Sequence, residues 1–222
     1  MQHTVETLPG GTRVWVNAQH RFGTDALLLA AFCNPKRNWS VCDLGSGSGI
    51  LLLSLLDKGL QGPATGVELD EAGAALLAGT AAENGYANVQ AVCANLQHYR
   101  SPHLVDMVVA NPPYFAAGLL PPTARRAAAR HETTATIADF CAAAARMLKD
   151  GGPFCVCFPP ARLADLIAAL RQHKLEPKRM QFVRNAAEAP PWLVLLDARK
   201  AGGVGLQILP DRIVPHGQPV EY

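Results

Sequence analysis

The segment Val41–Gly49 reads Val-Cys-Asp-Leu-Gly-Ser-Gly-Ser-Gly, and an apolar stretch, Ile50–Lys58, follows it and ends at Gly59. The run Trp39–Leu44, which overlaps the start of this segment, is typical of a buried strand. The glycines that follow allow the backbone to turn sharply. The apolar stretch after the turn predicts a helix. A strand, a glycine-rich turn and a helix in this order predict an open α/β sheet with a ligand crevice at the carboxyl ends of its strands.

The glycine spacing and the preceding acid narrow the class of ligand. The glycines alternate as G-x-G-x-G, whereas a dinucleotide site has G-x-G-x-x-G, and no Gly-Lys-Ser/Thr follows that would indicate a P-loop. Asp43 would repel a pyrophosphate but suits the cationic amino-acid end of S-adenosylmethionine. A tight strand–helix connection would explain the glycines alone but not the acid. We therefore predict that Asp43, Gly45, Ser46, Gly47 and Gly49 bind S-adenosylmethionine.

A second acid ends the next predicted strand, Ala64–Leu69. Glu68 follows Asp43 by 25 residues, which is one strand–helix–strand step. An acid at this place can accept hydrogen bonds from both ribose hydroxyls of a nucleoside cofactor. This feature also fits NAD, so it indicates nucleoside binding without separating the two cofactors. Leu69, beside the acid, is predicted to belong to the same cofactor site.

The sequence Asn111-Pro112-Pro113-Tyr114 follows the predicted strand Val105–Ala110. Two successive prolines lack N–H groups and cannot continue a β-ladder, so they leave the Pro112 carbonyl without a ladder partner. Together with the Asn111 side-chain carbonyl it offers two acceptors, which match the two N–H bonds of a planar amino group. Tyr114 would stack on the base or amide that carries this group. For this motif alone, a proline-rich turn is the alternative. After such a glycine loop, the motif predicts catalytic roles for Asn111, Pro112 and Tyr114, and Asn111 is also predicted to contact the cofactor.

The remaining chain alternates strand-like and helix-like segments, which predicts about seven strands wound with helices in one domain, residues 24–222, with residues 1–23 as a small N-terminal cap. The other main strands are predicted at Asn88–Cys93, Phe154–Phe158, Met180–Arg184 and Trp192–Asp197, with short additional strands at Val14–Asn17 and Leu206–Leu209. Further helices are predicted at Thr24–Cys33, Glu71–Asn84, Thr134–Lys149 and Pro160–His173.

Composition excludes several classes of protein. The 222 residues are 49% hydrophobic and 17% charged, which excludes disordered and collagen-like chains. The longest apolar run, Ala26–Cys33, is too short to span a membrane, and no secretion signal is visible, so we expect a cytoplasmic protein without membrane contact. The six cysteines form no C-x-x-C pair, so no metal site is predicted; Cys42, Cys93, Cys155 and Cys157 are interpreted as buried strand residues.

Positive charge gathers in the second half of the chain. Residues 1–111 carry a net charge of −3 and residues 112–222 carry +5, which is compatible with a nucleic-acid partner. Arg125, Arg126 and Arg130 follow the Asn-Pro-Pro-Tyr motif, and the last two would share one helix face. Because guanidinium groups suit phosphates, these three are predicted to contact RNA; a solvated surface is the alternative.

Taken together, Asp43–Gly49, Glu68 and Asn111–Tyr114 resemble class I S-adenosylmethionine-dependent methyltransferases that act on a planar nitrogen. From about Arg13 onward the chain is similar to the bacterial adenine-N6 methyltransferases that modify the adenosine beside the anticodon of a valine tRNA. Besides the core motifs, the stretches Phe22–Ala30, Ala129–Glu132 and Ala198–Gly203 carry this resemblance.

This resemblance implies a Rossmann-like sheet of seven strands whose last strand is antiparallel. It implies that Thr24 and its neighbours close over the methionine end of the cofactor and that Asn95 lies beside the cofactor's adenine. The expected activity is N6-methylation of an adenine in RNA, with tRNA as the partner. The Asn-Pro-Pro-Tyr motif also serves glutamine methylation of release factors and N2-methylation of rRNA guanine, which remain alternatives. A non-catalytic nucleoside-binding module would not need this motif.

Overall fold

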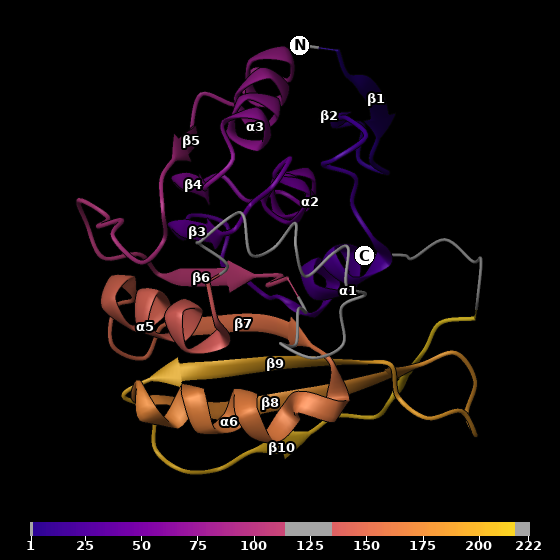
Figure 1. The fold of residues 1–222 in the computed structure, drawn as a ribbon, viewed down its shortest axis with the longest axis vertical. Helices are drawn as coiled ribbons and strands as arrows, with labels where there is room; N and C mark the ends of the chain where they lie inside the picture. Colours follow the sequence, from indigo (N-terminus) through magenta and orange to yellow (C-terminus); the bar gives the residue numbers. More distant parts are fainter. Residues whose placement is uncertain (1, 114–134, 216–222) are drawn as a thin grey trace, which may run out of the picture.

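A computed structural model describes residues 2–113 and 135–215, and the fold is a twisted sheet between two layers of helices (Figure 1). The neighbouring strands of the sheet follow the order β10-β8-β9-β7-β6-β3-β4-β5. These strands are β3 (Val41–Leu44), β4 (Ala64–Glu68), β5 (Val89–Cys93), β6 (Met107–Ala110), β7 (Pro153–Phe158), β8 (Leu175–Arg184), β9 (Leu193–Lys200) and β10 (Gln207–Ile208).

The helices are α1 (Thr24–Phe32), α2 (Ile50–Asp57), α3 (Glu71–Glu83), α5 (Ile137–Met147) and α6 (Leu163–Gln172), with a short 3-10 turn, η1 (Pro160–Arg162), before the last. Most ends lie within a residue or two of the predicted ones. None of the described helices is long and apolar enough to cross a membrane.

The strand directions match the sheet that the resemblance implies. β3, β4, β5, β6 and β7 pair in parallel, whereas β9 is antiparallel to both of its neighbours, β7 and β8. These seven strands make the predicted α/β sheet with its last strand reversed. Two short strands, β10 and β11 (Arg212–Ile213), extend the β8 edge by pairing in parallel with it. Because the parallel strands share one direction, the ends of β3, β4 and β6 meet at one edge of the sheet.

Each face of the sheet has its own apolar core. On one face, leucines of α1 and α2 pack against the side chains that point that way from β3, β6 and β7, such as Val41, Val109 and Cys155. On the other face, α5 and α6 pack against the alternate side chains, such as Leu44 and Val108. Strand residues are therefore buried on both faces, which explains why the parallel strands read as continuous apolar runs.

The N-terminal residues form a hairpin that the sequence predicts only in part. β2 (Arg13–Val16) matches the predicted strand, but β1 (Thr4–Thr7) was not predicted, because its exposed side chains carry no apolar pattern. The hairpin docks on α3, where the Trp15 backbone N–H donates to Thr80 Oγ1 at 2.8 Å. Its buried valines share a core with α1 and α2. The division into a cap of residues 1–23 and a domain of residues 24–222 stays a prediction.

Three predictions about local structure are wrong, each for a physical reason. Cys93 is exposed rather than buried, because it stands at the end of β5, which is an edge strand of the sheet. Strand β8 begins at Leu175 and not at Met180, and Pro177 stands at a register shift of the β8–β9 ladder, where a missing N–H is tolerated. Helix α5 begins after Thr136, which caps it in a capping box with Asp139.

Candidate functional site

The glycine loop joins β3 to α2 with a backbone that only glycine adopts readily. Gly45, Gly47 and Gly49 have φ angles of +70°, +54° and +84°, all in the left-handed region. At Gly49 a Cβ atom would also lie 2.4 Å from a side-chain carbon of Leu77 in α3. Glycine is therefore required at all three positions by the left-handed backbone, and at Gly49 also by the close packing of the loop against α3.

Glu68, at the end of β4, holds the loop from the side. Its Oε2 accepts the Gly47 backbone N–H at 2.8 Å, and its Oε1 accepts the Asp70 backbone N–H at 2.9 Å. Each carboxylate oxygen has further lone-pair capacity, so Glu68 can still accept hydroxyl donors. The same side chain thus fixes the loop and faces the ligand crevice.

Asp43 lies at the end of β3, where it is 1% exposed. Its Oδ2 has no hydrogen-bond partner among the described residues, and the residue is part of the lining of a cavity. Burial, followed by repulsion from the Glu68 carboxylate, raises the pKa of Asp43 from 3.8 to about 8, although a hydrogen bond from the Leu52 backbone partly opposes this. A buried carboxyl group with an unsatisfied oxygen is suited to a cationic ligand, whose charge would restore the ionised form.

The Asn-Pro-Pro segment begins where β6 ends, beside the glycine loop. Asn111 is half-buried, Pro112 is buried and Pro113 is exposed. The Asn111 Oδ1 lies 3.0 Å from the Cys157 thiol of β7, which donates to it. An amide oxygen carries two lone pairs and accepts hydrogen bonds, which is the capacity that the sequence motif calls for.

Two cavities meet at these strand ends. One, of about 320 Å³, lies over the glycine loop and includes Asp43; the other, of about 470 Å³, lies over the ends of β4 and β5 and includes Glu68. Their linings share His20, Arg21, Gly45 and Asn111, so they form one continuous crevice. We refer to the two cavities together as the crevice.

The structure brings most of the predicted cofactor residues to this crevice. The predicted residues that line it are Asp43, Gly45, Ser46, Gly47, Glu68, Leu69, Asn95 and Asn111. Gly49 is absent from the lining, because it caps α2 behind the loop. Thr24 begins α1 and is also absent, although its neighbours Gly23, Asp25 and Ala26 line the crevice. Pro112 is buried and is also absent from the lining, whereas its neighbours Asn111 and Pro113 line it. Tyr114, Arg125, Arg126 and Arg130 lie outside the described residues.

Several lining residues were not predicted from the sequence. His20 and Arg21 come from the segment between β2 and α1, and Phe140 comes from the first turn of α5. The two residues directly precede the Phe22–Ala30 stretch, but no local pattern marks them as ligand-binding. Phe140 has only an apolar helix pattern around it. Their place in the crevice follows from how the chain folds over the strand ends.

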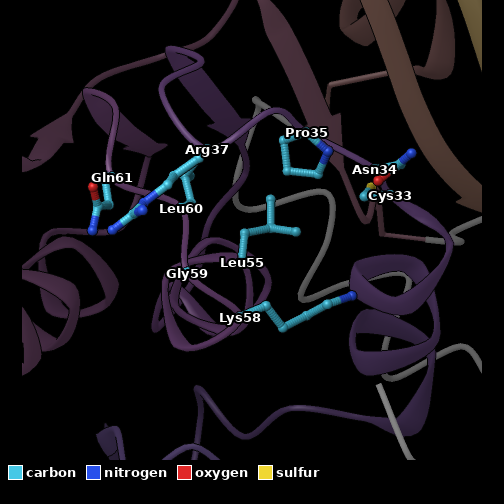
Figure 2. A pocket seen from close by; sticks show the side chains of 9 residues that line it. All are labelled: Cys33, Asn34, Pro35, Arg37, Leu55, Lys58, Gly59, Leu60 and Gln61. Atoms are coloured by element: carbon cyan, nitrogen blue, oxygen red, sulfur yellow. The ribbon is translucent and has the colours of Figure 1, made fainter.

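Another cavity, of about 460 Å³, lies between the segment after α1 and the end of α2 (Figure 2). Its lining includes Cys33, Arg37, Lys58 and Gln61. Residues 33–37 precede β3, so this cavity is at the amino end of that strand, away from the glycine loop. The Lys58 ammonium group donates to the Ala30 carbonyl at 3.0 Å. None of the predicted site residues lies here.

Several basic side chains of the second half are held by acids instead of standing free for a nucleic acid. Arg179 and Arg199 both contact the buried Asp197, at 3.1 and 3.3 Å. Arg184 pairs with Asp211. These pairs support β8 and the strands and loop beside it, so the charge excess of residues 112–222 is in part structural.

A seven-stranded sheet with this order, an acid before an alternating glycine loop, and Asn-Pro-Pro at the end of β6 define a class I S-adenosylmethionine-dependent methyltransferase. The model of the Methyltransferase small domain family matches residues 4–162, and the chain belongs to this family.

Named relatives cover most of the chain. A tRNA1(Val) (adenine(37)-N6)-methyltransferase from Dickeya chrysanthemi is 33% identical over 186 residues, which make up 82% of this chain and 74% of the relative. A protein of the same name from Bacteroides thetaiotaomicron is 26% identical over 206 residues, covering 91% of this chain and 86% of that one.

Solved structures share the fold. A predicted O-methyltransferase from Agrobacterium tumefaciens has a TM-score of 0.69 at 19% identity, with 87% of this chain and 89% of that chain covered. The 16S rRNA N2 G1207 methyltransferase of T. thermophilus, solved with AdoMet and guanosine, has a TM-score of 0.62 at 22% identity, with 90% and 50% covered. At these identities the likeness establishes the architecture of the sheet and its helices.

Proposed function

We propose that this protein transfers a methyl group from S-adenosylmethionine to N6 of an adenine in RNA, and that the substrate is the adenosine beside the anticodon of a valine tRNA. The observation that carries this proposal is the position of Asn111, which lines both halves of the crevice at the end of β6. Relatives named for this reaction, at up to 33% identity over most of the chain, support the choice of substrate.

The residues of the crevice fit the proposed cofactor. Asp43, buried and with one oxygen unsatisfied, would receive the ammonium group of the cofactor's amino-acid end. Glu68 would accept the ribose hydroxyls, and Leu69, which is 47% exposed, offers an apolar surface at the adenine end beside Asn95. When bound, S-adenosylmethionine supplies an electrophilic methyl group on a positively charged sulfur.

The chain's own contribution to the reaction is to hold an amino group whose lone pair is delocalised into a ring. Asn111 Oδ1 and the Pro112 carbonyl would each accept one N–H of the adenine amino group, which favours a pyramidal nitrogen with an available lone pair. With the donor bound, the held nitrogen would be placed to form its bond to the methyl carbon as the sulfur–carbon bond breaks, and one nitrogen proton would then leave to solvent. Positioning and charge stabilisation suffice for this step, without a strong base.

The partner proposed here is RNA, and Arg125, Arg126 and Arg130 are proposed to contact its phosphates. Tyr114 is proposed to stack on the target base. These four residues lie outside the described part of the chain, so their roles are supported by the sequence motif and its spacing from Asn111. Phosphate contacts predict that binding of tRNA weakens steeply as salt is added.

The direct test is methyl transfer to defined substrates. Purified protein is incubated with methyl-labelled S-adenosylmethionine and an unmodified valine tRNA transcript, and the digested nucleosides are separated by chromatography. Label in N6-methyladenosine, and its loss when the target adenosine is replaced by guanosine, is the expected result. The Asn111→Ala variant serves as the control for contaminating activity.

The same assay separates the alternatives. A peptide with the glutamine motif of a release factor and unmodified 16S rRNA replace tRNA in parallel reactions. Label in the peptide or in N2-methylguanosine, with none in tRNA, would refute the proposed substrate while preserving a methyltransferase. Absence of cofactor binding in calorimetry would refute the proposal altogether.

A further inference from the structure

The segment of residues 17–23, which we call the strap, passes over the crevice between β2 and α1. It contains no regular secondary structure, and its residues His20 and Arg21 line both halves of the crevice. Asn17 stabilises its first turn, because its Oδ1 accepts the backbone N–H groups of Gln19 and His20 at 3.0 and 2.7 Å. This turn shapes the strap but does not tie it to the opposite wall of the crevice.

A side-chain pair makes that connection. His20 Nε2 lies 2.6 Å from Asp70 Oδ2, across a sequence separation of 50 residues. The His20 side chain is only 15% exposed, although it lies on a surface segment. Asp70 sits at the N-cap of α3, where its other oxygen accepts the Ala72 N–H at 3.2 Å. We refer to the His20–Asp70 contact as the clasp.

The clasp continues into the residues proposed to bind the cofactor. The Asp70 backbone N–H donates to Glu68 Oε1, and Glu68 Oε2 accepts the Gly47 N–H of the glycine loop. His20, Asp70, Glu68 and Gly47 therefore form an unbroken chain of hydrogen bonds around one end of the crevice. The hydrogen bond from His20 lowers the pKa of Asp70, which indicates that the pair favours the ionised carboxylate.

The His20 ring packs against α3 at Gly73, a residue without a side chain. Gly73 stands inside the first turn of α3, where glycine is a poor helix former. A Cβ atom there would lie 3.0 Å from His20 Cε1, 3.0 Å from Glu68 Cγ and 3.2 Å from the Gly47 carbonyl oxygen. The small residue thus lets the ring, the acid and the loop approach α3 together.

We propose that the His20–Asp70 clasp closes the strap over the crevice and is a positioning element that sets the affinity and residence time of the cofactor. The inference rests on the proposed cofactor site and adds to it a role for two residues that neither the motifs nor the reaction requires. His20 acts through the strap and through Glu68, and it takes no part in methyl transfer.

The test measures binding and release of S-adenosylhomocysteine by the full-length protein with His20→Ala, Asp70→Ser and the double variant. Serine is as good an N-cap as aspartate but too short to reach the imidazole, so Asp70→Ser removes the clasp and keeps the helix cap. Each single variant is expected to raise Kd about tenfold, mainly through faster release, and the double variant is expected to add little. The KM for the cofactor rises by the same factor, whereas kcat changes much less.

Two further variants complete the design. Asp70→Asn keeps both the cap and an acceptor for the His20 N–H, and it is expected to recover part of the lost affinity. Glu71→Ser removes a neighbouring carboxylate from the same turn of α3 and is expected to leave Kd unchanged. Thermal unfolding verifies that every variant is folded.

The outcomes separate the clasp from the cofactor site itself. Single variants that bind like the parent protein, or effects that add fully in the double variant, would overturn the clasp while leaving the proposed function intact. A parent protein that binds no cofactor would refute the proposed function. A kcat that falls as much as KM rises would assign His20 to the reaction rather than to positioning.

Discussion

Replacing Asp43 by Asn removes a buried ionisable group while keeping the size of the side chain. The folded-state pKa of Asp43 is about 8, against 3.8 for the ordinary side chain. The folded protein therefore retains a proton that the unfolded chain has already lost, so unfolding free energy decreases as pH rises through this interval. This cost is absent below the unfolded pKa and reaches its full size above the folded one.

The magnitude follows from linkage. Between about pH 5 and about pH 8 the Asp43 carboxyl group lowers stability by about 1.4 kcal/mol per pH unit, or about 3–4 kcal/mol in all. The amide that Asp43→Asn introduces has no such dependence, and any penalty from its own buried donors is the same at every pH. The difference in Tm between Asp43→Asn and the parent protein should therefore move in favour of the variant by roughly 10 °C over this range.

The assay is thermal or urea unfolding of both proteins across the pH range without cofactor. Comparing the two proteins cancels the titration of all other groups. A difference in unfolding free energy that stays constant to within about 1 kcal/mol from low to high pH would refute the proposed burial cost of Asp43.

The same residue predicts a proton coupled to cofactor binding. A bound ammonium group favours the ionised carboxylate, so below about pH 8 the parent protein should release up to one proton when the cofactor binds. In this range its Kd for the cofactor should therefore fall about tenfold for each unit by which the pH is raised. Calorimetry in buffers of different ionisation enthalpy measures this proton, and Asp43→Asn is the matched control. Equal proton release by the two proteins would contradict the pairing of Asp43 with the cofactor's cation.

Three further perturbations test the site and the sheet. Asn111→Ala should lower turnover at least about 100-fold and leave cofactor Kd within a few fold, as single-turnover assays and calorimetry can measure; normal turnover would exclude the proposed role. Gly49→Ala should lower the free energy of unfolding in urea by about 2–4 kcal/mol, because the φ angle is +84° and the added Cβ would lie 2.4 Å from a side-chain carbon of Leu77. Gly59→Ala is the control: its φ angle is +103° but the space around it is open, so it should cost only about 1 kcal/mol. Arg179→Met should cost about 2–4 kcal/mol in the same assay, since it weakens the pairing of the buried Asp197; a loss below about 0.5 kcal/mol would show that Arg199 compensates.

Much of the crevice could be predicted because its signals are local. The alternating glycines of residues 45–49 all adopt positive φ, and Asp43 and Glu68 lie where two neighbouring parallel strands end. Parallel strands bring their carboxyl ends to one edge, so an acid at the end of each strand necessarily approaches the same ligand site. The place of Asn111 follows from the same rule, since β6 is the neighbour of β3.

Other features had no local signal. β1 has an exposed, patternless sequence and forms only because β2 is available to pair with it. The start of β8 could not be predicted, because Pro177 and charged side chains such as Arg179 are not typical of a buried strand. The partner of Arg179, Asp197, comes from another strand. In the sequence, Gly73 is only an unfavourable residue within a predicted helix. The structure explains it, because the ring of His20 lies where a side chain would be.

The amino-acid sequence by itself determined the order of the main strands and helices, the glycine loop, and the presence of acids and an Asn-Pro-Pro segment at strand ends. It could do so because backbone preferences and apolar periodicity act between near neighbours. Tertiary structure alone decided that His20 reaches Asp70 across 50 residues, that Cys157 contacts Asn111, and that Asp43 holds its proton up to a pKa of about 8. Partners and proton affinities of this kind depend on burial and on groups brought together from distant parts of the chain, which no local pattern specifies.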